Sequence, residues 1–327
     1  MLAWRKHSQR AGFNMVRKPP SIPESSRESG FALVVVLWLA VLVALVAAVF
    51  TNAVRSRLRE TAARASLLQA EALADAGVRI GILALLNPDP NAKFAPRYQS
   101  ASAAITCAVP DAGVLTIEIE DEEGKVNLNT SNDALLMALF SGLGASDAEA
   151  RAYSAKILDF RDADDEARPD GAERQDYEKA KGLPAGPKNG DFIAVSELDQ
   201  VVGLPPELRE RAKPFLTTFS QQNGVDAARM PKGLAEILER GARVATTSPG
   251  LSNGKDLPAS FLAVSSKRAF MIRPEAFTQS GARYSIEAIV QLPDTPNGVP
   301  LMRQWQRSTS RLSGPADAVT RGNWPPC

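Results

Sequence analysis

The chain has 327 residues, 44% of them hydrophobic, and a formal net charge of +1. This near-neutral balance excludes a global electrostatic attraction for nucleic acid, so such binding would need a local basic patch. With two cysteines and one histidine, His7, the sequence also excludes a disulfide scaffold and, in its soluble part, Ser-His-Asp, Cys-His and histidine-ligated zinc sites.

An unbroken apolar run, residues 31–50, follows a basic leader that ends at Gly30. The run matches the roughly 20 residues that cross a bilayer, and it is longer than the apolar region of a secretory signal. The basic leader favours a cytoplasmic N-terminus, whereas the arginines after the run weigh against it. Met1 and Met15 are alternative starts of translation.

Apolar or small residues continue at intervals of three or four, which predicts one helix from the apolar run to about Leu86. No proline interrupts this helix before Pro88, and Asn87-Pro88-Asp89-Pro90 ends it. The alternative is a plain anchor followed by a separate short helix. The residues that define this apolar face of the helix are Val54, Leu58, Ala62, Ala65, Leu68, Ala72, Ala76, Ile80 and Leu83.

Strand patterns follow this helix. Residues 114–120 alternate between apolar and polar, and a turn at 121–124 leads into 125–129, which predicts a β-hairpin. Helical patterns punctuated by Gly and Pro come next, and strands return at 261–272, 284–292 and 301–306. We therefore expect a helical domain inserted into a small sheet. The expected segments are the leader 1–30, the membrane segment 31–50, the soluble helix half and first strands 51–130, the inserted domain 131–245, the linker 246–258, the returning strands 259–310 and the tail 311–327.

The two cysteines, Cys107 and Cys327, allow a single disulfide in an oxidising compartment. The alternative is two unpaired thiols, with Cys327 disordered beside Pro325 and Pro326.

The junction between the polar leader and the apolar run looks like the substrate of a prepilin peptidase, which cuts before the apolar segment and leaves it attached. In this respect the chain resembles type IV pilin-like proteins. The resemblance implies cleavage after Gly30 and N-methylation of Phe31 by that peptidase.

A more specific resemblance rests on several motifs in order along the chain. They are the sequence from Asp121 to Asn129, the sequence from Ile157 to Asp164, Gly171-Ala172-Glu173, Tyr177, Pro187-Lys188-Asn189, Ser196-Glu197-Leu198 and Val202-Gly203-Leu204. Together with the Gly30 junction they resemble the general secretion pathway protein K family, the largest minor pseudopilins of the type II secretion system. The family usually has Trp where Phe160 stands.

This resemblance implies an α+β fold, with a long N-terminal transmembrane helix packed on a small antiparallel sheet and a large inserted all-α domain that is SAM-like or helix-hairpin-helix-like. It also implies a non-enzymatic role at the tip of the pseudopilus, with the minor pseudopilins I and J and the inner-membrane assembly platform as partners. The N-terminus would be cytoplasmic and the folded domains periplasmic.

Val35 occupies the fifth position counted from Phe31, where most pilin-like subunits have a glutamate that pairs with the N-terminal amine of a neighbour. An unpaired charge in hydrocarbon is costly, and a subunit with no neighbour above it needs no such carboxylate. Val35 therefore fits a tip position. The alternative is an ordinary anchor that never enters a filament.

Carboxylates crowd residues 159–173, where they would repel one another unless they are solvated or bridged by a cation. Hard oxygen ligands suit Ca²⁺, although the spacing is not that of an EF-hand. A homologous domain raises the expectation of structural calcium, and the ligands that we predict are Asp159, Asp162, Asp164 and Glu173. The alternative is a solvated acidic loop.

Two other functions compete with assembly. The turns Gly142-Leu143-Gly144 and Val202-Gly203-Leu204 resemble helix-hairpin-helix turns, which often hold DNA phosphates, so a membrane-tethered, competence-type DNA-binding protein is the main alternative. The adjoining loop is acidic, however, and we expect no nucleic acid partner. An enzyme is not expected, because nothing fixes two carboxylates across a cleft.

Overall fold

The computed structural model describes residues 29–86, 103–181, 186–245, 257–295, 298–309 and 323–327. The leader before Ser29 and most of the predicted linker and tail lie outside these described residues. The chain divides into two compact units, residues 1–61 and 62–327.

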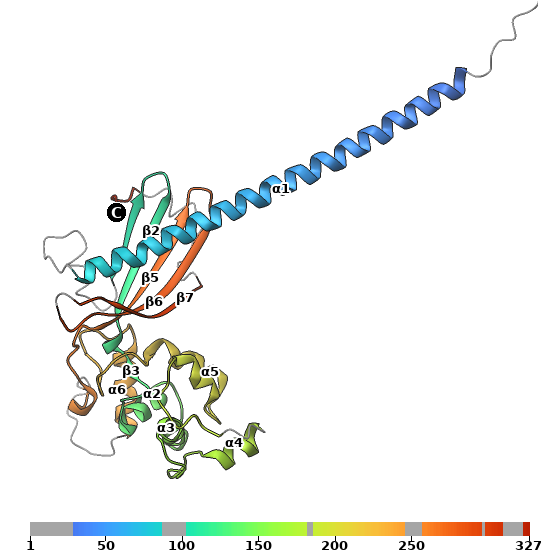
Figure 1. The fold of residues 1–327 in the computed structure, drawn as a ribbon. Coiled ribbons are helices and arrows are strands. Elements are labelled where there is room, and N and C mark those ends of the chain that lie inside the picture. The colour runs from blue at the N-terminus through green and yellow to red at the C-terminus, as the bar shows by residue number, and fades with distance from the viewer. Residues whose placement is uncertain (1–28, 87–102, 182–185, 246–256, 296–297, 310–322) are drawn as a thin grey trace, which may run out of the picture. The chain divides into compact units, whose positions relative to one another are not determined.

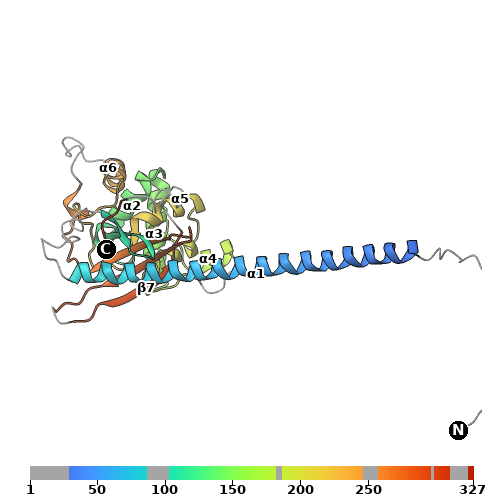
Figure 2. The same cartoon turned by 90° about the horizontal axis from the view of Figure 1, so that it is seen from above.

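One helix, α1 (Ser29–Leu86), spans 58 residues without a break, as Figure 2 shows. It is the one helix in the described residues that is long and apolar enough to cross a membrane. The predicted continuous helix is therefore confirmed and the alternative of two separate helices is wrong, whereas Asn87-Pro88-Asp89-Pro90, expected to end the helix, lies outside the described residues.

The described part of the second unit contains a five-stranded antiparallel sheet in the order β1-β2-β5-β6-β7. Figure 1 shows the C-terminal half of α1 over one face of this sheet, and the buried cluster between them includes Leu73, Val78, Leu115 and Ile272. The strands are β1 (Ala103–Val109), β2 (Gly113–Asp121), β5 (Ala269–Thr278), β6 (Arg283–Gln291) and β7 (Leu301–Arg307).

The face of α1 that packs on the sheet is only partly the predicted apolar face, of which Ile80 packs against the buried cluster. Small residues make the contact: a Cβ at Gly77 would lie 2.6 Å from Pro274 Cβ, and one at Gly81 would lie 2.7 Å from Ile272 Cγ2. Leu68 and Leu83, members of the predicted face, are each 65% exposed. At about 100° per residue, Leu68 and Gly77 lie on opposite sides of the helix. Close approach selected glycine and alanine, whereas the prediction followed the larger apolar side chains.

Two strand predictions were also wrong. Residues 125–129 do not return beside β2, which pairs instead with β1 and β5. The strand expected at 261–272 begins at Ala269, because Phe261 lies in a 3-10 turn and is buried in the helical domain. The expected strands at 284–292 and 301–306 are confirmed as β6 and β7. The register of β5 with β6 skips Arg273 and Pro274, as expected for a proline, which has no N–H to donate.

Between β2 and β5 the chain forms a helical body with its own buried core, which includes Leu139, Phe140 and Leu238. Helices α2 and α6 pack closely because glycines lie at their crossing: a Cβ at Gly142 would lie 1.9 Å from the Ile237 carbonyl oxygen. The described elements are η2 (Glu122–Gly124), β3 (Val126–Asn127), α2 (Asp133–Gly142), α3 (Asp147–Arg161), α4 (Arg174–Lys181), η3 (Val195–Gln200), α5 (Pro206–Ala212), η4 (Lys213–Phe215), β4 (Leu216–Thr217), α6 (Leu234–Ala245) and η5 (Ala259–Phe261).

Candidate functional site

The segment from Asp121 to Asn129, one of the motifs of the sequence analysis, follows β2 and joins the sheet to the helical body. Asp121 caps the η2 turn through Glu123 N–H and accepts a 2.7 Å hydrogen bond from Ser265 Oγ. Asn129 forms a two-way pair with Phe192, accepting its N–H at 2.7 Å and donating to its carbonyl at 2.9 Å. β3 pairs in parallel with β4 rather than closing a hairpin.

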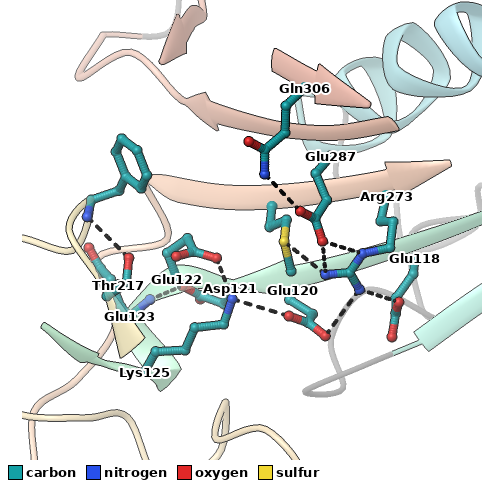
Figure 3. A network of polar contacts seen from close by, with 12 residues as sticks. Glu118, Glu120, Asp121, Glu122, Glu123, Lys125, Thr217, Arg273, Glu287 and Gln306 are labelled. Carbon is teal, nitrogen blue, oxygen red and sulfur yellow. Dashed lines mark hydrogen bonds and ion pairs between the residues drawn. The ribbon is translucent and has the colours of Figure 1, made fainter. Parts of the chain in front are cut away.

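Buried charges reinforce this junction, as Figure 3 shows. Lys125 Nζ lies 2.6 Å from Glu122 Oε1 and 3.2 Å from Glu120 Oε2. Burial acts to lower the pKa of Lys125, but these carboxylates outweigh it, and the pKa is raised. Arg273 lies 2.7 Å from Glu118 and 2.8 Å from Glu287. These groups line a cavity of about 630 Å³, but each is satisfied by a partner, so we place the candidate ligand site elsewhere.

Orphaned carboxylate oxygens are found in the predicted acidic segment. Ligand oxygens of Asp159, Asp162 and Glu173 lie within 4.8 Å of one another. Glu173 is 6% exposed, and neither of its carboxylate oxygens has a hydrogen-bond partner in the described structure, nor has Asp162 Oδ1. Buried carboxylates without partners are costly unless something neutralises them.

Local structure fixes the positions of these three groups. Asp159 lies in the last turn of α3, fully buried, and its carboxylate accepts N–H groups from Ala172 at 2.9 Å and Arg168 at 3.2 Å. Asp162 is the C-cap of α3, with Oδ2 2.8 Å from Arg168. Glu173 immediately precedes α4, where its own N–H donates to Asp176. A single cation, Arg168, thus faces two of the three carboxylates.

The electrostatics of the cluster follow from burial and repulsion. Burial, followed by repulsion from Asp159 and Asp162, raises the pKa of Glu173 to about 7. Burial also raises the pKa of Asp159, against the hydrogen bonds from Arg168 and Ala172. A divalent cation bound between these carboxylates would favour their charged forms and so offset the cost of burial and repulsion.

The geometry fits a hard cation. Calcium takes oxygen ligands at about 2.3–2.6 Å, so two oxygens on one ion lie at most roughly 5 Å apart, which matches the observed spacing. The residues that fit are Asp159, Asp162 and Glu173.

Asp164, the fourth predicted ligand, is not part of this group. Its Oδ1 accepts the N–H of Glu166 at 3.0 Å within its own exposed loop. Asn189, which the acidic pattern could not single out, donates to the Asp164 carbonyl at 3.0 Å, and its Oδ1 is buried without a partner in the described structure. The sequence feature that could have identified Asn189 was its place in the family motif Pro187-Lys188-Asn189.

The remaining predicted site residues lie apart from this cluster. Gly30 and Phe31 lie in the first turn of α1, and Val35 is exposed on the same helix. Cys107 and Cys327 are joined by a disulfide. The N–H groups of the Gly142 turn are already bonded, that of Leu143 to the Leu139 carbonyl at 3.0 Å and that of Gly144 to the Ser141 carbonyl at 2.9 Å, whereas Gly203 adopts φ +79° in its turn. Phe160, at the position where the family usually has Trp, stacks on Phe192 at 4.7 Å.

An apolar helix of membrane-spanning length whose C-terminal half packs on an antiparallel sheet, with a largely helical insertion between β2 and β5, defines a pilin-like fold. Residues 117–221, which include the acidic cluster, match the family model described as type II secretion system (T2SS), protein K. Over these residues, about a third of the chain, the sequence is similar to the type II secretion system protein K family.

The fold is also similar to that of a solved chain described as "The Crystal Structure of the GspK-GspI-GspJ complex from enterotoxigenic Escherichia coli Type 2 Secretion System". The match covers 78% of this chain and 99% of that one, with a TM-score of 0.54 and 18% identity. At this identity the likeness is one of fold. No curated protein matches the chain in sequence.

Proposed function

We propose that this chain is the tip subunit of a pseudopilus, which assembles helix beside helix with partners of the GspI and GspJ type and so supports protein secretion across the outer membrane. The observation that carries this proposal is the second apolar row of α1. Leu68 and Leu83 are each 65% exposed, on the side of the helix opposite the sheet. A row that its own domain leaves uncovered fits lateral packing against neighbouring helices.

The N-terminal features fit the same assembly. Prepilin peptidase would cleave after Gly30, methylate Phe31 and leave residues 31–50 as the anchor, with the N-terminus cytoplasmic and the folded units periplasmic. Val35 offers no carboxylate to a neighbour's amine, which a subunit with no neighbour above it does not require.

The helical insertion, residues 131–245, would serve as a broad, rigid platform for protein contacts, of SAM-like or helix-hairpin-helix-like build. Its breadth would prevent another subunit from being added above it. The insertion would also sit close to the inner-membrane assembly platform before the tip is lifted. No nucleic acid partner forms part of this proposal.

Calcium would hold the insertion in shape. Asp159, Asp162 and Glu173 would bind the ion, with the remaining coordination from carbonyls or water. Bound calcium would supply positive charge between carboxylates that otherwise repel, and so would tie the end of α3 to the start of α4.

Two measurements on membrane-purified protein test the proposal. Terminal-peptide mass spectrometry should find methylated Phe31 as the first residue only when prepilin peptidase is present. The full chain, co-expressed with the minor pseudopilins I and J, should co-purify with both. The proposed function would be contradicted if the N-terminus were Met1 or Met15 both with and without prepilin peptidase. It would also be contradicted if the chain purified without either partner.

A further inference from the structure

The two edges of the five-stranded sheet are treated differently by the chain. At the β1 edge, the C-terminal residues add a short parallel bridge between Ala108 and Pro326. Ala108 donates its N–H to the Pro325 carbonyl at 2.8 Å and accepts the N–H of Cys327 at 3.0 Å. The Cys107–Cys327 disulfide fixes this bridge covalently. The β1 edge is therefore closed at this point.

The β7 edge is open in the described structure. No described residue forms a strand on the outer side of Leu301–Arg307, and six of its seven residues are exposed. Natural sheets usually protect such an edge with short strands, prolines, bulges or covering segments. Here β7 itself carries a bulge at Arg303, opposite the step from Ile289 to Val290, yet Met302 and Trp305 remain 44% exposed.

The direction of the free backbone groups follows from the register. Ser308 donates its N–H to the Ser285 carbonyl at 2.9 Å, so Ser308 turns its hydrogen-bonding groups toward β6. In an antiparallel pair this orientation alternates along the strand. Arg307 and Trp305 therefore turn their N–H and C=O groups outward, where a further strand would find them.

Side chains on β7 indicate which strand would fit. Trp305 lies opposite Ala288 and Met302 opposite Val290, both buried beneath α1, so these apolar side chains belong to the α1 face of the sheet. The strand's charges, Arg303 and Arg307, are both positive and exposed. An acidic strand is the complement, with apolar side chains on the face shared with α1.

We propose that β7 is an edge-pairing surface for an extended, acidic strand of a neighbouring pseudopilin subunit. This inference rests on the proposed function, in which the neighbouring subunit has an N-terminal helix of its own. A strand of that subunit added beside β7 would extend the sheet, and the neighbour's helix would then pack on the same side of the extended sheet as α1. Backbone pairing at the edge would give affinity, and the arginines would set register.

A photo-crosslinking amino acid in place of Trp305, in the full chain co-expressed with minor pseudopilins I and J, tests the proposal. We expect crosslinks to an acidic, extended segment of one of them. The same probe at Val264, which is 84% exposed on a loop, serves as the control. Arg303→Glu should lower the Trp305 crosslink at least fivefold, whereas Arg151→Glu on α3 should leave it unchanged.

Co-purification of the three subunits separates the two proposals. If the subunits co-purify but Trp305 gives no more crosslink than Val264, or crosslinks to a second copy of this chain, the edge-pairing inference is wrong and the assembly proposal stands. If they do not co-purify, both fail. Arg307→Pro removes an outward N–H together with the guanidinium that lies 5.0 Å from the Tyr284 ring centroid, so it should reduce the crosslink more than Arg307→Ala, which removes the guanidinium alone.

Discussion

Gly171 lies directly against Asp159: a Cβ at position 171 would be 1.9 Å from the Asp159 Oδ2 atom. Since Asp159 is fully buried and held by backbone N–H groups, it cannot move aside without losing them. Gly171→Ala should therefore destabilise the protein by about 1–3 kcal/mol. Gly190→Ala is the matched control, because a Cβ at position 190 would meet no atom within 4 Å. Equal urea midpoints for the two variants would contradict this prediction.

Calcium should stabilise the protein more at higher pH. In the ion-free state the pKa of Glu173 is raised from 4.5 to about 7. The folded state then holds more protons than the unfolded one between these values, so stability falls as pH rises through this window. A bound cation reverses that loss. In calorimetry we expect calcium to stabilise the protein only slightly at about pH 5. At about pH 8, with calcium at roughly 100 times its Kd, we expect a stabilisation of about 2–3 kcal/mol.

Glu173→Gln distinguishes the effect of the buried carboxylate charge on stability from the effect of bound calcium. In the ion-free protein this variant should be more stable than the parent at about pH 8, by up to about 3 kcal/mol, because the buried charge is gone. It should also lose most of the calcium-induced shift. Asp164→Gln, outside the cluster, is the control and should keep the shift. Calorimetry with and without chelator provides the measurement, and an unchanged calcium response of the Glu173 variant would rule out our ligand assignment.

Substitution of the buried Lys125 should lower the free energy of unfolding more than substitution of a more exposed lysine. Lys125→Met leaves the buried Glu122 carboxylate without its 2.6 Å partner, which should cost about 3–5 kcal/mol. The double variant Lys125→Met with Glu122→Gln should recover part of that loss. Lys188→Met, whose partner Glu197 is less buried, should cost less than about 1 kcal/mol. Chemical denaturation that ranks the two single variants equally would argue against a structural role for the junction.

The membrane segment gives a prediction about assembly. Leu39→Asp places a charge near the middle of the apolar run, at a cost of about 3 kcal/mol in a helix within the bilayer. It should block incorporation into the tip complex, whereas Val264→Asp on an exposed loop and an Asp in the leader should not. Recovery of the Leu39 variant in the complex at parental yield would count against lateral packing by this helix.

Much of the architecture was predictable because it depends on long patterns. The 58-residue helix and two of the returning strands follow from periodicity. The packing face of α1 was not predictable in this way. Leu68 and Leu83 are more hydrophobic than Gly77 and Gly81, but the distance between helix and sheet selected the glycines.

The site was partly predictable for a similar reason. Charge density identified Asp159, Asp162 and Glu173, but it could not separate them from Asp164, because that distinction depends on which carboxylates the fold buries. The hairpin prediction failed at Glu122–Gly124, where the chain turns into the helical body instead of returning to the sheet. Such a choice is set by tertiary burial of Val126 and Leu128.

The disulfide has a consequence for how the protein reaches its folded state. The core of the helical body uses residues from one stretch of the chain, Val126 to Phe261, so it can form before the later residues have folded. The sheet cannot, since its central strand β5 follows that body and its β1 edge is closed by Cys327, which lies 220 residues after Cys107. Completion of the sheet domain is therefore a late event in folding, which must wait until Cys327 can reach Cys107.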